Sequence, residues 1–187
     1  MPHITHRSIT HRSITHRSIS HRSISDEESR MSQAVDIGIP DQKLKTIVHG
    51  LSRVLADSYT LYLKSHNYHW NVVGPMFHSL HTMFMDEYTE LALAVDEIAE
   101  RIRALGAPAP ATYRQFAELS VVTEDTDQPG AQEMIRRLVA AHEATARTIR
   151  AVLPVVEDAP DQVSTDLLVR RLDVHEKTAW MLRSMLA

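Results

Sequence analysis

The 187-residue chain contains no cysteine, and this absence limits both its redox chemistry and its metal chemistry. Disulfide bonds and thiolate ligands are excluded, so a bound metal ion must be held by histidine nitrogen or carboxylate oxygen. A reducing compartment fits this composition, and we expect a cytoplasmic protein. Long apolar runs are missing as well, because none approaches the roughly 20 residues that span a bilayer. We therefore expect a soluble protein without a membrane segment or signal peptide.

Glycine and proline are also scarce, with 5 and 8 residues, whereas alanine, leucine, glutamate and arginine are plentiful. This balance favours helices over a turn-rich sheet, and the length suits one domain with a single core. The net charge of −4 is spread unevenly, because residues 6–25 carry four arginines and no acidic residue. The remainder of the chain is therefore clearly acidic.

The first 30 residues form a basic, low-complexity arm. From His6 to Ser25 a five-residue unit, HRSIT or HRSIS, occurs four times in succession. A period of five matches neither helix nor strand, and one isoleucine per unit cannot build a core, so we expect residues 1–30 to be disordered. Evenly spaced arginines favour non-specific contact with nucleic acid. Duplication of a short DNA segment is the stronger explanation of the repeats, and with Met31 as the true start the arm would be an extension without a selected function.

Residues 31–187 are predicted to form one all-α domain. Apolar residues three and four positions apart predict helices at about 41–72 and 76–105, a third from about 135 to Pro154 or slightly beyond, and a fourth after Pro160. His142 and His175 fall among the apolar positions of the last two. More than twenty residues, with a short helix at 112–119, separate the second helix from the third. One long crossover between short connections is typical of the ferritin-like four-helix bundle.

Histidines gather where the first helix gives way to the second. Four lie within sixteen residues: His66, His69, His78 and His81. Further along the second helix, Asp96 and Glu100 stand four positions apart and project from consecutive turns. Imidazole and carboxylate together are ligands for ferrous iron or zinc. A carboxylate pair of this spacing is also common on solvated helix faces, where an arginine such as Arg101 neutralises it.

Helix geometry restricts how these ligands can be combined. His81 and Asp96 are fifteen positions apart on one predicted helix, which corresponds to roughly 22 Å at a rise of 1.5 Å per residue. Two ligands of one ion cannot lie so far apart. A shared site therefore requires a second, antiparallel copy of the chain, and a two-fold dimer would contain two identical sites.

The sequence resembles the Dps family, the DNA-binding proteins from starved cells or miniferritins, within the ferritin-like superfamily. The resemblance covers about residues 41–187, excludes the arm, and includes a terminal run at residues 175–183 that is similar to the last helix of the family. Its signature residues are His66-Asn67-Tyr68-His69-Trp70-Asn71-Val72, Gly74, Phe77, Leu80-His81, Phe84, Tyr88, Asp96-Glu97-Ile98-Ala99-Glu100-Arg101-Ile102 and Leu105-Gly106.

The resemblance implies a hollow dodecamer with an iron site at each two-fold interface. His69 and His81 would be ligands from one subunit, and Asp96 and Glu100 from its partner, with Glu100 as the principal bridging carboxylate. The family's activity is that of a ferroxidase: it oxidises Fe(II) to Fe(III), typically with hydrogen peroxide, and stores the ferric mineral. That chemistry protects DNA from oxidative damage. The alternative is a nucleoid-compacting, DNA-binding protein with weak or no ferroxidase activity.

Three further features bear on this assignment. Trp70 matches an aromatic residue of the family that is thought to intercept radical intermediates. Met85 stands where many members have an acidic residue, and Asp86 follows one position later. The sequence therefore does not establish whether a second iron position is occupied. Acidic residues before and within the last helix are candidates for an iron entry pore at a three-fold axis or for a helix N-cap and its first turn: Asp158, Asp161 and Asp166.

Overall fold

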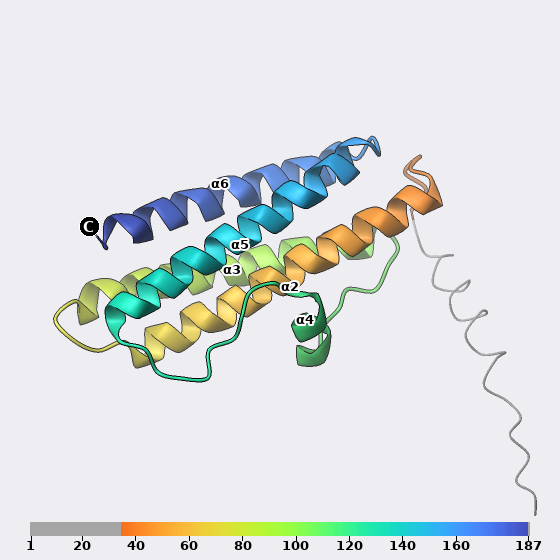
Figure 1. Ribbon diagram of the computed structural model, residues 1–187. Coiled ribbons are helices and arrows are strands. Elements are labelled where there is room, and N and C mark those ends of the chain that lie inside the picture. The colour runs from red at the N-terminus through yellow and green to blue at the C-terminus, as the bar shows by residue number, and fades with distance from the viewer. Residues whose placement is uncertain (1–34, 187) are drawn as a thin grey trace, which may run out of the picture.

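The computed structural model describes residues 35–186, and within this range it contains five helices and no strand. Four long helices lie side by side: α2 (Asp41–Asn71), α3 (Phe77–Ala104), α5 (Ala131–Glu157) and α6 (Gln162–Ser184) (Figure 1). The short helix α4 (Tyr113–Leu119) interrupts the crossover from α3 to α5. The predicted all-α bundle, its helix order and its short extra helix are confirmed. The arm at residues 1–30 lies outside the described residues.

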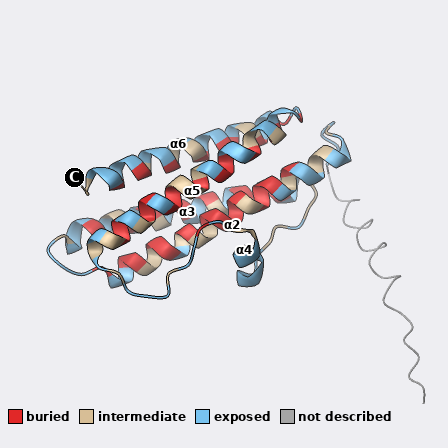
Figure 2. Cartoon of the chain, in the orientation of Figure 1, coloured by how far each residue is buried: buried red, intermediate tan, exposed pale blue. Residues whose placement is uncertain are grey.

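The bundle is held together by apolar stripes that face inward on each long helix (Figure 2). Helix α2 packs against α3 and α5, and α5 packs against α6, whereas the backbones of α3 and α6 come close together over only a short stretch. This arrangement follows from the three-and-four spacing of the apolar side chains, which places them on one face of each helix. None of the described helices is both long enough and apolar enough to cross a lipid bilayer.

Two aspartates join the crossover to α2, one buried and one half-buried. Asp57 is fully buried and accepts hydrogen bonds from Ser120 Oγ at 2.8 Å and from the backbone N–H of Val121 at 2.7 Å. Asp125, in the crossover itself, pairs with the buried Lys64 at 2.5 Å. Buried carboxylates persist only when they are hydrogen-bonded or paired, so these contacts fix the path of the long connection.

Candidate metal centre

A tight connection between α2 and α3 sets the position of the histidine cluster. Helix α2 ends at Asn71, and Gly74 follows with a φ of 112°, a backbone conformation that side-chain-bearing residues rarely adopt. The carbonyl oxygen of Gly74 then accepts a 3.0 Å hydrogen bond from Phe77 N at the start of α3. The chain thereby reverses within a few residues, and the end of α2 lies against the first turns of α3.

This reversal brings His69 and His81 into direct contact. Their rings stack with centroids 3.8 Å apart and planes inclined by 22°. Each ring also bonds to the other residue's backbone: His69 Nδ1 donates to His81 O at 2.7 Å, and His81 Nδ1 donates to His69 O at 2.8 Å. Because a carbonyl oxygen can only accept, each Nδ1 carries a proton, and in the neutral form of each ring Nε2 keeps a free lone pair. A backbone carbonyl that fixes the tautomer in this way is a common support for a metal-binding histidine.

Aromatic rings surround the histidine pair. His66 lies between Trp70 and Tyr88, at centroid distances of 4.0 and 4.1 Å. Tyr88 meets His69 edge-on at 5.2 Å, and burial followed by the neighbouring His69 lowers the pKa of His66. Trp70 nevertheless remains 63% exposed. The fourth histidine of the cluster, His78, is exposed.

Asp96 and Glu100 lie elsewhere on α3, and the structure does not bring them to the histidine pair. Both side chains are exposed, and neither joins an ion pair within residues 35–186. Arg101, the expected salt-bridge partner, instead donates to Asp161 at 2.6 Å and to Ser164 Oγ at 2.8 Å. Across the described part of a single chain, no three histidine or acidic side chains are grouped so that they could hold a metal ion.

Met85 occupies the turn of α3 after His81, with its side chain 40% exposed. Asp86, the next residue, is also exposed. A shift of one residue rotates a side chain by about 100° around a helix axis, so Asp86 leaves α3 in a different direction from Met85. Asp86 therefore does not place a carboxylate on the face of α3 that carries Met85.

The acidic residues beside α6 divide between the two roles considered for them. Asp161 is buried and serves as the N-cap of α6, accepting from Ser164 N at 3.0 Å. The N-cap interpretation is thus confirmed for Asp161, which also holds Arg101. Asp166 pairs with Arg170 at 2.9 Å, and Asp158 pairs with Lys43. Only the latter two are exposed, so any pore function falls to them.

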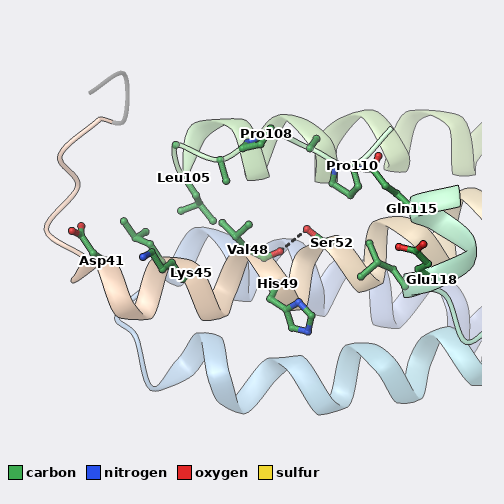
Figure 3. A pocket seen from close by; sticks show the side chains of 15 residues that line it. Asp41, Lys45, Val48, His49, Ser52, Leu105, Pro108, Pro110, Gln115 and Glu118 are labelled. Carbon is green, nitrogen blue, oxygen red and sulfur yellow. Dashed lines mark hydrogen bonds between the residues drawn. The ribbon is translucent and has the colours of Figure 1, made fainter. Parts of the chain in front are cut away.

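A separate surface groove runs between the first half of α2, residues 105–110 and α4 (Figure 3). Most of its lining is apolar, including Val48, Leu105 and Pro110, with His49 and Glu118 at its edges. None of the residues expected to bind metal lines it. The groove is therefore distinct from the histidine pair and the acidic pair.

Comparison with known proteins places the chain among ferritin-like proteins. A family model of the ferritin-like domain matches residues 48–187. DNA protection during starvation protein 2 from Bacillus anthracis is 44% identical over 80 residues, which are 43% of this chain and 55% of that protein. An uncharacterized low temperature-induced protein from Nostoc is 39% identical over 101 residues, 54% of this chain and 56% of its own length. The chain spans about half the length of the curated relatives it matches.

Solved structures match over a longer range. The Dps protein from Vibrio cholerae O1, described as a member of a broad superfamily of ferritin-like diiron-carboxylate proteins, superposes with a TM-score of 0.78 at 27% identity. The match covers 82% of this chain and 97% of that one. Dps from Staphylococcus aureus gives a TM-score of 0.73 at 33% identity, covering 75% of this chain and 95% of its own.

Proposed function

The chain belongs to the ferritin-like family and, within it, to the Dps proteins, and on this premise we propose that it is one subunit of a shell that binds, oxidises and stores iron. The observation that carries the proposal is the His69–His81 pair. Its two Nδ1–H groups are both used by backbone carbonyls, which leaves two neutral Nε2 donors in one place. Neutral imidazole is a good ligand for ferrous iron and needs no prior loss of a proton.

The remaining ligands would come from a second copy of the chain. Asp96 and Glu100 lie roughly 22 and 28 Å along α3 from His81, by the rise of an α-helix. In a two-fold dimer with antiparallel α3 helices, the acidic pair of each subunit would meet the histidine pair of the other. The exposed Trp70 would then be covered by the partner. Two carboxylates and two imidazoles balance the charge of one ferrous ion and leave positions for water or oxidant.

In the proposed reaction, two ferrous ions each give one electron to one molecule of hydrogen peroxide. The peroxide takes up two protons and leaves as two molecules of water, so no hydroxyl radical is released. Iron is the substrate, and the ferric product would be stored in the cavity of a dodecamer. Met85 supplies no carboxylate, so the four ligands define one iron position, and the second ion would be held mainly by Glu100 and solvent.

Protection of DNA would follow from this chemistry alone, because iron and peroxide are removed together. Two relatives carry the name DNA protection during starvation protein. Direct binding of DNA through the basic arm, in a cytoplasmic and nucleoid-associated protein, is the alternative function. The five arginines of the arm, from Arg7 to Arg30, lie outside the described residues.

Anaerobic loading with Fe(II), followed by hydrogen peroxide, tests the proposed activity. Ferric absorbance should rise rapidly in the wild-type protein and slowly in a His69→Ala, Glu100→Ala double variant. A His49→Ala variant is the matched control, since His49 is an exposed histidine of the same helix that lies away from the pair. Equal rates in the double variant and the wild type would refute the proposed site.

A further inference from the structure

Halfway along the bundle, buried polar side chains interrupt the core. One apolar cluster includes Ile149 and Leu168, and a second includes Leu138 and Leu182. Between these positions, α5 contributes His142 and α6 contributes His175, with exposed fractions of 1% and 0%. Two ionisable rings in the middle of a core are costly unless other groups satisfy them. The groups that satisfy these two rings therefore indicate what this buried polar layer, formed around His142 and His175, can do.

Four side chains, one from each long helix, form a continuous hydrogen-bonded chain. Ser65 Oγ on α2 lies 2.8 Å from Glu87 Oε1 on α3, and the same oxygen lies 2.7 Å from His142 Nε2. His142 Nδ1 lies 3.0 Å from His175 Nδ1. All four residues are buried. A proton therefore has an unbroken sequence of short donor–acceptor contacts from α6 to α3.

Two arrangements of protons with neutral imidazoles satisfy the two nitrogen atoms that face each other. When Glu87 is ionised, His142 donates from Nε2 to the carboxylate, so its Nδ1 is bare and accepts from His175 Nδ1–H. When Glu87 is protonated, it donates to His142 Nε2, and His142 Nδ1–H donates to a bare His175 Nδ1. Both imidazoles are neutral in both arrangements, and only their tautomers differ.

Each end of the chain holds a buried atom without a partner in the described residues, namely Glu87 Oε2 and His175 Nε2. Unsatisfied buried polar atoms are rare and point to a role beyond packing. Arg171, one turn before His175, is also buried and pairs with Glu90 of α3. Burial, followed by the charges of His142 and Arg171, lowers the pKa of His175 well below its usual value. A cationic imidazole is therefore disfavoured here.

We propose that Glu87, His142 and His175 form a proton-transfer chain through the centre of each bundle. A proton arriving at His175 Nε2 releases the proton of His175 Nδ1 to His142 Nδ1. His142 then passes its Nε2 proton to Glu87 Oε1, and the carboxylate becomes a neutral carboxyl group. One proton has been taken up, one negative charge has been removed, and no imidazolium remains. The transfer needs no metal, so it is independent of the proposed iron chemistry.

Nuclear magnetic resonance of isotope-labelled histidines tests the proton-transfer chain, because it reports the tautomer of each ring. The sample is metal-free, full-length protein, and the pH is varied over the range in which the protein stays folded. We expect His142 to change from the Nε2–H to the Nδ1–H tautomer as the pH falls, and His175 to change in the opposite sense with the same midpoint. Separate midpoints, an imidazolium at either buried ring, or unchanging tautomers would each overturn the proposal.

Two variants identify the terminal acceptor. Glu87→Gln removes the only carboxyl group of the proposed proton-transfer chain, so the coupled change of tautomers should disappear. Ser65→Ala removes a hydroxyl that stabilises the carboxylate, so the coupled change should persist with its midpoint at higher pH. Persistence of the coupled change in Glu87→Gln would contradict the proposal. So would an unchanged midpoint in Ser65→Ala, the milder variant that keeps every charged group of the layer.

Discussion

Replacing His81 with asparagine separates its contact with α2 from its proposed role as an iron ligand. Its Nδ1–H donates to His69 O and joins α3 to α2, while its Nε2 is free for a metal ion. The amide of asparagine can replace the Nδ1 donor but offers nothing at the position of Nε2. Alanine replaces neither. His81→Asn should therefore fold almost normally and lose iron oxidation, whereas His81→Ala should lose both stability and activity.

The size of the stability effect follows from the contacts. A hydrogen bond of this kind contributes about 1 kcal/mol, and the stacking of His81 on His69 and Phe77 contributes about another 1 kcal/mol. We expect His81→Ala to destabilise the subunit by about 2 kcal/mol and His81→Asn by about 1 kcal/mol. Chemical denaturation of metal-free protein measures the difference, and ferric absorbance after peroxide measures activity. Wild-type activity in His81→Asn, or wild-type stability in His81→Ala, would refute this reasoning.

Further predictions concern the core and the arm. Gly50→Ala would place a Cβ 2.6 Å from Cγ1 of Val152. The clash should outweigh the gain in helix propensity and destabilise the protein by about 1–2 kcal/mol, measured by thermal unfolding. In a double variant, Val152→Ala should relieve the clash. Because His175 is neutral when folded but binds a proton when unfolded, its contribution to stability should be complete above about pH 6.5 and fall by up to about 1.4 kcal/mol per pH unit below it. His175→Phe should show a shallower dependence in denaturant titrations, and an equal slope would contradict the assignment. A chain that starts at Met31 should bind DNA more weakly than the full chain in gel shifts. The slope of log affinity against log salt concentration should be smaller by about 0.9 for each lost phosphate contact. Equal affinity of the two chains would exclude a role for the arm.

The helices were predictable because apolar periodicity and the breakers Gly74 and Pro160 act locally. The sequence predicted that His69 and His81 lie near each other, but not that each ring bonds to the other residue's backbone. Those bonds depend on how closely the end of α2 packs against the start of α3. The assignment of Asp96 and Glu100 as ligands rests on spacing and resemblance. Within one chain these two side chains lie too far from the histidine pair to share a metal ion with it.

Glu87 shows what local sequence patterns miss. It stands among acidic residues of a polar helix stretch and carries no motif, yet it is buried against Ser65 and His142. Its burial depends on packing between three helices that are distant in sequence. A signal was nevertheless present: His142 and His175 both fall on apolar faces, and a polar residue at such a position needs a buried partner.

Mixed assembly tests most directly whether the metal centre is shared between two chains. Subunits with His69→Ala and His81→Ala retain the acidic pair, and subunits with Asp96→Ala and Glu100→Ala retain the histidines. Neither assembly alone should oxidise Fe(II) rapidly. Random co-assembly makes about half of the dimers mixed, and each mixed dimer has one intact site of two, so about a quarter of the wild-type rate should return. No recovery in mixed shells of normal mass would contradict a site shared between copies.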